Sequence, residues 1–232
     1  MSKRSKRFKT AVEKIKGKEE YTLPEAVKAV KENASAKFDE SVEIAFKLGI
    51  DPKQPEQMVR STVKLPHGTG KSVKVIAFAE GAAAEEARKA GADVVGMAEL
   101  AEKITAGWMD FDIVVATPAA MKVIGKLGKV LGPKGLMPSP KAGTVSPDVA
   151  QAVKEVKAGK IEIKADKTSN LHAFVGKVSF DEQKLFENAQ AVVNAVLKSK
   201  PVSSKGIYMQ SATLSSTMGP GLKLNLREIQ GV

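Results

Sequence analysis

The feature of this sequence that most constrains its fold is a change of pattern along the chain. From about residue 72 to 157, short β-rich runs alternate with helical runs, which is the order that a parallel α/β unit requires. On both sides of this stretch, apolar and polar residues alternate instead, as in antiparallel strands with one exposed face. Neither flank has enough elements to form a domain alone. We therefore predict a discontinuous α+β domain with an antiparallel sheet, residues 1–67 plus 160–232, and an inserted Rossmann-like three-layer α/β domain, residues 68–159.

The individual elements follow from the same patterns. In the middle we expect strands at 73–78, 92–95 and 111–116 and helices at 82–89, 98–105, 118–131 and 147–157, the last capped by Ser146. In the flanks we expect strands at 38–48, 59–65, 161–164, 171–180, 207–214 and 222–226, with a helix at 181–197. The first flanking strand would bury Phe38 together with Val42 and Ile44, and would pair with 59–65. Glycines near 66–70 and 157–160, where the chain crosses between the domains, predict hinges.

The charge balance points to an acidic partner, because the chain carries a formal net charge of +11 and has a pI near 9.6. One basic cluster is the run Lys3, Arg4, Lys6, Arg7 and Lys9. This run predicts a flexible arm that follows a phosphate backbone, and a solvated tail is the alternative. A second cluster is the acid-free interval between Asp112 and Asp148, which contains Lys122, Lys126, Lys129, Lys134 and Lys141.

The first three lysines of that interval recur at helical spacing. Ile124, Leu127 and Leu131 fall on another face of the same expected helix, so that one side would pack and the other would be cationic. After this helix, the Pro and Gly residues of 132–143 predict a stiff, exposed basic loop. A merely solvated face is the alternative interpretation of these lysines.

Several classes of function are disfavoured by composition. The chain has no cysteine and two distant histidines, so we expect no metal and no cofactor. It shows no secretory signal and no run of 18 apolar residues, which predicts a cytoplasmic protein without membrane contact. Gly70-Lys71-Ser72 resembles the end of a phosphate-binding loop but precedes a strand, and the turn at 79–84 has a single glycine. A nucleotide-dependent α/β enzyme therefore stays only as an alternative, as does a DNA-binding protein.

The C-terminal stretch suggests a surface that binds nucleic acid. Ser211, Thr213 and Ser215 alternate along an expected strand, so their hydroxyls would form a row able to bond phosphates or ribose hydroxyls. The turn at 216–221 follows, where glycines permit close backbone approach and Met218 could pack on a base. An ordinary Ser/Thr-rich hairpin is the alternative. The tract 164–170 looks like a turn with contacts.

Three motifs resemble those of the bacterial large-subunit ribosomal protein one family, and the resemblance covers essentially the whole chain. They are Ser-Ser-Thr-Met-Gly-Pro at 215–220, the proline- and glycine-rich run at 131–145, and Ala-Lys-Phe-Asp-Glu-Ser-Val-Glu at 36–43. Ser139 stands where Asn is common in the family, a mild departure that leaves the loop geometry intact.

This resemblance implies a non-enzymatic, two-domain ribosomal protein that is monomeric when free. Its implied partners are the ribosome, large-subunit rRNA at the mobile stalk near the exit site, exit-site tRNA, and its own operon mRNA, whose translation it would repress. The RNA-binding residues carried over by position are Lys37, Phe38, Glu43, Lys167, Thr168, Ser211, Thr213, Ser215, Thr217, Met218 and Gly219. For the five middle-domain lysines we hypothesise contact with tRNA or with further RNA.

Overall fold

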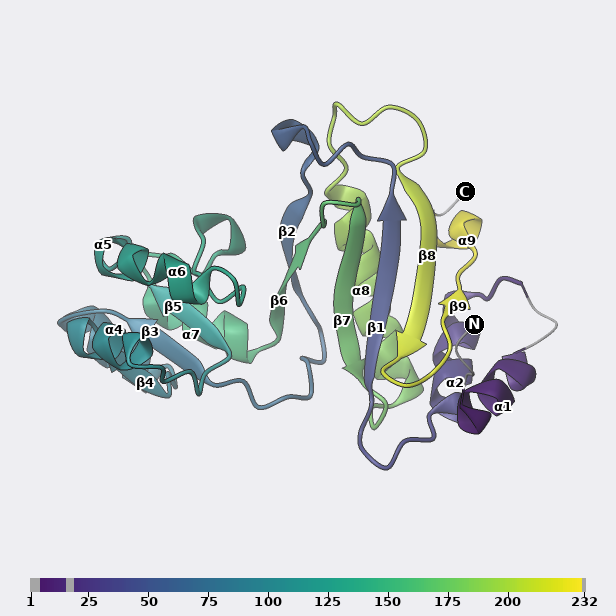
Figure 1. Ribbon diagram of the computed structural model, residues 1–232, viewed down its shortest axis with the longest axis horizontal. Helices are drawn as coiled ribbons and strands as arrows, with labels where there is room; N and C mark the ends of the chain where they lie inside the picture. The colour runs from purple at the N-terminus through teal and green to yellow at the C-terminus, as the bar shows by residue number, and fades with distance from the viewer. Residues whose placement is uncertain (1–4, 16–18, 231–232) are drawn as a thin grey trace. The chain divides into compact units, whose positions relative to one another are not determined.

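The computed structural model describes residues 5–15 and 19–230, which form two compact units (Figure 1). The split unit comprises the chain up to Gly70 and again from Ile161 onward, and the inserted unit comprises Lys71–Lys160. The domain boundaries expected at residues 67 and 160 stay a prediction. Among the described residues, no helix combines the length and apolarity needed to cross a bilayer.

The split unit is built around a four-stranded antiparallel sheet. Its strands, in spatial order, are β7 (Asn170–Lys177), β1 (Ser41–Leu48), β8 (Met209–Ser216) and β9 (Leu222–Lys223). The helices of this unit are α1 (Lys6–Ile15), α2 (Leu23–Asn33), α8 (Glu182–Lys198) and α9 (Leu226–Gln230), with a short turn of 3-10 helix, η1 (Pro55–Gln57). A separate pair of strands, β2 (Arg60–Lys64) and β6 (Lys160–Lys164), completes it.

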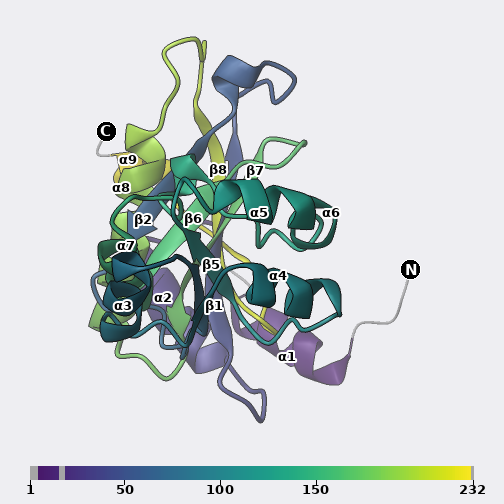
Figure 2. The same ribbon diagram turned by 90° about the vertical axis from the view of Figure 1, so that its left-hand side faces the viewer.

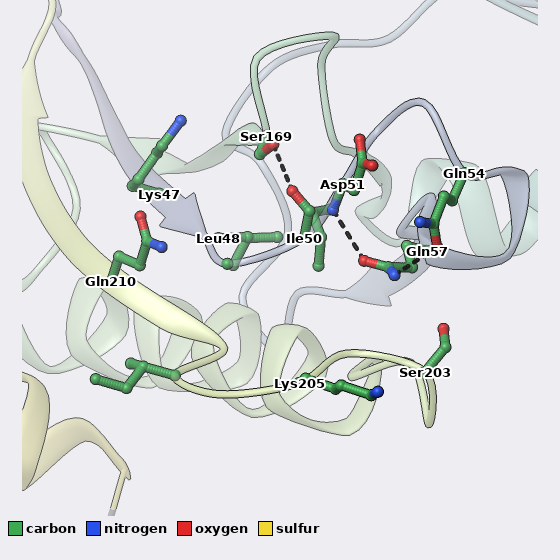
Figure 3. Close-up of a pocket in the computed structure, with 12 residues that line it drawn as sticks. Lys47, Leu48, Ile50, Asp51, Gln54, Gln57, Ser169, Ser203, Lys205 and Gln210 are labelled. Carbon is green, nitrogen blue, oxygen red and sulfur yellow. Dashed lines mark hydrogen bonds between the residues drawn. The ribbon is translucent and has the colours of Figure 1, made fainter.

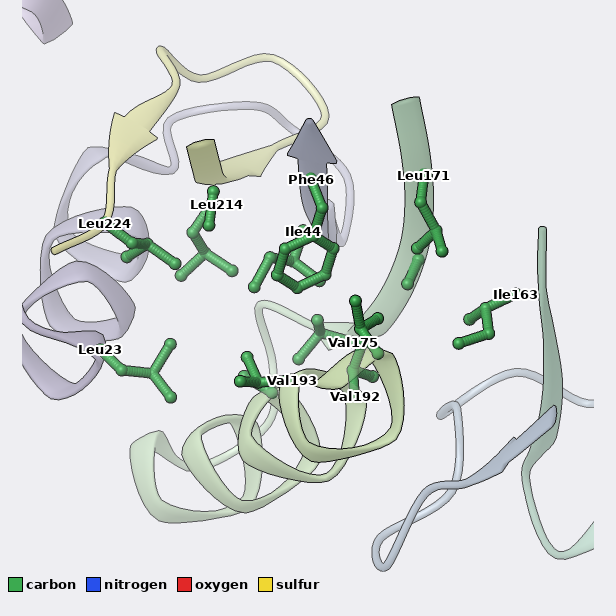
Figure 4. Close-up of a cluster of buried hydrophobic side chains, with 14 of the residues drawn as sticks. Leu23, Ile44, Phe46, Ile163, Leu171, Val175, Val192, Val193, Leu214 and Leu224 are labelled. Atoms are coloured by element: carbon green, nitrogen blue, oxygen red, sulfur yellow. The ribbon is translucent and has the colours of Figure 1, made fainter. Parts of the chain in front are cut away.

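The core of the split unit lies on one face of this sheet. Every second residue of β1, from Val42 to Leu48, is buried, and Val192 and Val193 of α8 belong to the same hydrophobic cluster (Figure 4). Helix α2 contributes further apolar side chains to the same cluster. The other face of β7, β1 and β8 carries no helix of the described part of this unit (Figure 1). The alternation in the sequence thus produces one packed face and one face left for contacts, which we call the open face.

Three expectations for the split unit are wrong. The strand expected at 59–65 pairs with β6 and not with β1, because both edges of β1 are occupied by β7 and β8. Phe38 precedes β1 and is 55% exposed instead of buried. The segment expected to be a strand at 222–226 forms only the two-residue β9 before helix α9 begins.

The basic N-terminal run also differs from expectation where it can be described. Lys6, Arg7 and Lys9 lie in helix α1 and not in a flexible arm, while Lys3 and Arg4 lie outside the described residues. The ten residues of α1 are amphipathic: Ala11 is buried and the partly buried Ile15 packs against the core. Because Ala11 and Ile15 occupy the side of α1 that faces the core, Lys6 and Lys9 lie on its exposed side.

The inserted unit is a three-layer α/β sandwich, as predicted. Its parallel sheet has the order β4 (Val94–Gly96), β3 (Val75–Phe78) and β5 (Ile113–Ala116). Its α-helices are α3 (Ala82–Lys89), α4 (Ala98–Thr105), α5 (Met121–Ile124), α6 (Gly128–Leu131) and α7 (Val149–Lys157), with 3-10 turns η2 (Gly125–Leu127) and η3 (Pro140–Ala142). Figure 2 shows α3 and α7 to the left of β5 and α4, α5 and α6 to its right, and each side has its own buried cluster.

Two local expectations in the inserted unit need correction. The helix expected at 118–131 is interrupted, since α5 and α6 are separated by the 3-10 turn η2. Gly125 and Gly128 lie at the two ends of that turn, and glycine stabilises an α-helix poorly. The cap of α7 is Asp148 and not Ser146, because an Asp148 carboxylate oxygen accepts a hydrogen bond from the Gln151 N–H at 2.9 Å.

Candidate nucleic-acid interface

The open face of the split unit presents cross-strand rows of mixed chemistry. Its outward residues on β1 are Glu43, Ala45 and Lys47, each opposite one residue of β7 and one of β8. The rows are Phe174–Glu43–Ser215, His172–Ala45–Thr213 and Asn170–Lys47–Ser211. Hydroxyls line the β8 side, and an acid and a base lie on β1. The face therefore offers donors and acceptors over its whole length, with Glu43 in one outer row and Lys47 in the other.

The three hydroxyls predicted from the alternation of 211–215 do share this face. Ser211, Thr213 and Ser215 are half-buried, while the intervening Ala212 and Leu214 point into the core. Within the described residues, no hydrogen bond engages these hydroxyls. A hydroxyl held on a rigid strand without an internal partner is available to phosphate or to a ribose 2′-OH.

The end of the face where β1 begins is organised by a buried carboxylate that the sequence did not single out. Glu40 is only 2% exposed. Its Oε2 accepts hydrogen bonds from the Ser216 hydroxyl at 2.7 Å and from the Met218 N–H at 3.0 Å, and its Oε1 accepts one from the Ala36 N–H at 3.1 Å. Burial alone would raise the pKa of Glu40, but these hydrogen bonds and the charge of Arg7 hold that pKa below its usual value. One carboxylate thus fixes two loops that are far apart in sequence.

Thr217 and Gly219 serve the geometry of this same loop. The Thr217 hydroxyl accepts a hydrogen bond from the Ser41 N–H at 2.9 Å, and the Thr217 N–H donates to the Ser41 carbonyl at 3.0 Å. A Cβ atom at position 219 would lie 2.5 Å from the Ser216 hydroxyl oxygen, so only glycine leaves the bond from Ser216 to Glu40 intact. The structure therefore gives both residues a positioning role, and their contact with RNA stays a prediction.

Two large apolar side chains are exposed at this end. Met218 is 46% exposed and Phe38 is 55% exposed, and Glu40 holds the segments that carry them. Lys37 is exposed beside Phe38, and Arg7 of α1 lies close enough for its charge to act on Glu40. Exposed aromatic and thioether groups next to cations are suited to stacking on nucleotides. We call this group, residues 36–40 together with 216–219, the loop end of the open face.

Lys167 and Thr168 lie at the opposite end, where β1 finishes and β7 starts. The Asp166 carboxylate accepts hydrogen bonds from the N–H groups of Asn170 and Thr168, both at 2.8 Å. These bonds, that of Asn170 first, lower the pKa of Asp166. The Lys47 ammonium donates to the Thr168 carbonyl at 2.5 Å, which ties this turn to the open face. The eight residues of β1 separate the two ends by about 24 Å at the usual rise per residue.

The five lysines expected in the middle domain are all exposed on the inserted unit. Lys122, Lys126 and Lys129 lie on α5, η2 and α6, opposite the buried Ile124, Leu127 and Leu131, as predicted. Lys134 lies in the stretch expected to be a loop, and Lys141 lies in the 3-10 turn η3 within that stretch. Among the described residues, none of the five forms an ion pair. Their charges are thus available to an external anion.

Sequence reasoning missed several members of the open face. Lys47, His172, Phe174 and Asn170 lie on it, but strand register is set by partners distant in the chain. The polar positions of the alternation in 41–48 and 170–177 could have pointed to them. No three or more His, Asp or Glu side chains converge as metal ligands in the part of the chain that the structure describes.

A split unit with an open, hydroxyl-lined antiparallel sheet and an inserted parallel α/β unit together define a two-unit protein of mixed α/β class. Comparison with known proteins gives the particular family. Residues 30–220 match the Ribosomal protein L1p/L10e family, and the chain belongs to it. The chain is therefore a ribosomal protein and not an enzyme, which confirms the prediction.

Two relatives show how far the similarity extends. The chain is 55% identical over 223 residues to "Large ribosomal subunit protein uL1" of Thermobifida fusca, covering 96% of this chain and 95% of the relative. It is 54% identical over 225 residues to the protein of the same name from Paenarthrobacter aurescens, with 97% and 96% covered. The likeness therefore includes both the split unit and the inserted unit.

Proposed function

We propose that the chain binds large-subunit rRNA through the open face of the split unit and through the loop end. The observation that carries this proposal is the row of unengaged hydroxyls on β8, which leads to the loop ordered by Glu40. The relatives are named as large-subunit proteins, which supports the choice of RNA. The protein would act in the cytoplasm as a ribosome-associated component, and as a monomer when free.

Affinity and selectivity would come from different parts of the molecule. The net charge of +11 attracts phosphates and makes binding fall with salt. The rigid hydroxyls recognise the shape and 2′-OH groups of RNA. Glu43, in the row nearest the loop end, would repel phosphate and accept hydrogen bonds from ribose hydroxyls or base amino groups, so it would define where the RNA backbone does not run.

A competition experiment tests this function. A structured large-subunit rRNA fragment, duplex DNA of equal length, and ATP or NAD would compete for the full-length chain across a salt series. We expect the rRNA fragment to win at every salt concentration. Equal affinity for duplex DNA would favour a DNA-binding protein, and saturable binding of a nucleotide cofactor would favour the alternative of a nucleotide-dependent enzyme.

We further propose that the protein lies at the mobile stalk near the exit site and assists release of deacylated tRNA. The exposed, unpaired lysines at 122, 126, 129, 134 and 141 support contact between the inserted unit and tRNA. In ribosomes carrying exit-site tRNA, crosslinkers placed at these lysines should capture tRNA. Reaction with solvent reagents alone would contradict this role.

Repression of its own operon mRNA is the last part of the proposal. A surface that recognises RNA shape would also bind a messenger segment that folds like the rRNA site. Added rRNA fragment should therefore relieve repression of a reporter that carries the operon leader. Repression that is unaffected by excess rRNA fragment would show that the two RNAs do not share the open face.

A further inference from the structure

An open pocket of about 890 Å³ adjoins the end of the open face that lies opposite the loop end. Its walls come from the end of β1, the loop that follows it, the turn at Ser169 and the segment that leads into β8 (Figure 3). Lys47 and Gln210 lie on one side of the hollow and Gln54 and Gln57 on the other. Its volume lies within the range of sites that hold small organic groups. Apart from Lys47, which lies on the open face, the residues that line this pocket are not among those proposed above to bind RNA.

A β-bulge brings Gln210 to this pocket. Lys47 pairs with Ser211, but the next residue of β1, Leu48, pairs with Met209, so Gln210 is the extra residue on β8. Bulges commonly redirect a side chain at a functional site. The Gln210 amide is exposed and makes no hydrogen bond within the described residues. It presents both a donor and an acceptor to whatever enters.

The backbone around the pocket is held in place. The Gly49 N–H donates to the Tyr208 carbonyl at 2.6 Å, and any side chain at Gly49 would collide with the Ile207 carbonyl. The Ser169 hydroxyl donates to the Ile50 carbonyl at 2.9 Å (Figure 3). A pocket whose walls are bonded to one another needs little reorganisation when it binds a ligand.

The lining has the chemistry of a nucleotide site. Lys47 and Lys205 supply two positive charges, and the acid among the lining residues, Asp51, already accepts a hydrogen bond from the Lys53 N–H at 3.1 Å. Ile207 is 73% exposed and offers an apolar surface for a base. The Gln210 amide matches the paired donors and acceptors of a base edge. An anion with a flat, hydrogen-bonding, partly apolar group satisfies all of these features.

The pocket is continuous with the open face. Lys47 belongs both to the lining and to the last cross-strand row, where it pairs with Ser211. We propose that the pocket holds one unpaired nucleotide of the RNA bound on the open face, with Gln210 at the base edge, Ile207 against the base and Lys205 at the phosphate. This inference rests on the proposed function and adds that the RNA must contain an unstacked nucleotide.

Chemical probing of the bound RNA tests the inference. The full-length chain would be added at saturation to a large-subunit rRNA fragment, and reagents that modify the Watson–Crick edges of unpaired bases would report protection. We expect wild-type protein to protect an unpaired base that remains reactive with Gln210→Ala or Lys205→Ala. Affinity should fall about tenfold in each variant, within the usual loss for one base contact.

Matched controls come from helices that pack on the opposite face of the sheet. Gln190→Ala on α8 and Lys28→Ala on α2 remove the same chemistry at exposed positions and should change neither protection nor affinity. Identical protection and affinity for wild type, Gln210→Ala and Lys205→Ala would overturn the inference. Saturable binding of AMP alone, lost in Gln210→Ala and without any protected base, would assign the pocket to free nucleotides and overturn it too.

The same assay separates this inference from the proposed function. If Met218→Asp loses rRNA binding while the pocket variants keep every protection, the open face binds RNA and the pocket does not. If wild-type protein fails to bind the rRNA fragment, the proposed function and the pocket inference both fall.

Discussion

Glu40 is the residue on which the geometry of the loop end depends. It satisfies three donors from two segments, and its carboxylate is almost completely shielded from solvent. Such a group is stable only while every partner is present, because a buried polar atom without a partner is costly. Stability and the shape of the binding surface are therefore coupled at this side chain.

Glu40→Gln should lower the free energy of unfolding by about 1–3 kcal/mol at neutral pH, since the amide NH₂ would face donors. Urea unfolding followed by circular dichroism measures this loss.

The pKa shift of Glu40 also predicts how the stability of the wild-type chain depends on pH. Because the folded pKa of Glu40 lies below its usual 4.5, its stabilisation is present above that pH and is lost as the pH falls through the folded value. The variant should therefore lose less stability than wild type on acidification, and an equal loss would contradict this account.

Met218→Asp should weaken binding of the rRNA fragment by about tenfold to a hundredfold, because it places a carboxylate where a nucleotide would stack. The exposed side chain makes the unfolding midpoint insensitive to this change. Gln190→Asp on α8 introduces the same charge on the other side of the sheet and is the control. Filter binding at matched salt measures the affinity of both variants for the rRNA fragment. Equal affinities for the two variants would remove Met218 from the proposed interface.

At the scale of elements, short loops and interrupted helices carry the positive charge of the inserted unit. The glycines that interrupt the helix between α5 and α6 differ from Gly219 in what surrounds them. No atom lies within 4 Å of a Cβ built at Gly128, whereas a Cβ at Gly219 would meet the Ser216 hydroxyl oxygen at 2.5 Å. A side chain at position 128 would therefore fit, whereas the surroundings of position 219 require glycine.

Gly128→Ala should accordingly stabilise the chain by up to about 1 kcal/mol, through lower entropy of the unfolded state and better helix propensity. Gly219→Ala should destabilise the chain and weaken RNA binding, because the added methyl group would displace the Ser216 hydroxyl and break its hydrogen bond to Glu40. Thermal unfolding and filter binding of both variants measure the contrast. Similar effects of the two substitutions would show that the loop end adapts to an added methyl group.

The elements also show what a sequence can predict. The three-layer inserted unit was predictable because its strands are short apolar runs between amphipathic helices. The hydroxyl row was predictable because Ser211, Thr213 and Ser215 alternate with buried residues. The partner of β2 was not, since strand pairing depends on residues distant in the chain. Helix α2 was overlooked although Pro24 and Glu25, typical of a first helical turn, mark its start. The role of Glu40 follows only from tertiary structure.

At the scale of the whole molecule, the first crossing into the inserted unit is anchored to the split unit. Asn188 of α8 is fully buried, and its Oδ1 accepts a hydrogen bond from the His67 N–H at 3.1 Å. Its Nδ2 donates to the carbonyls of Gly68 at 3.1 Å and Val175 at 2.8 Å. Hinges near 66–70 and 157–160 remain a prediction, and these bonds hold the backbone of His67 and Gly68 to α8.

Asn188→Ala should release this anchor and lower stability by about 1–3 kcal/mol, because it leaves buried backbone groups without partners. Since the chain contains no cysteine, Lys28→Cys and Glu86→Cys would carry a specific dye pair, one dye on each unit. Energy transfer between the dyes should change when the rRNA fragment binds, and its distribution should broaden in Asn188→Ala. One fixed distance with and without RNA would contradict the predicted hinges.

The pairing of β1 with strands from the far side of the insertion has a consequence for the order of events during synthesis. Ser41 of β1 is bonded to Lys177 across 136 residues and to Thr217 across 176 residues. The inserted unit, by contrast, is formed by the continuous segment Lys71–Lys160. Because domains fold as their residues emerge, the inserted unit completes first, while β1 waits with its apolar face uncovered until the last third of the chain has been made.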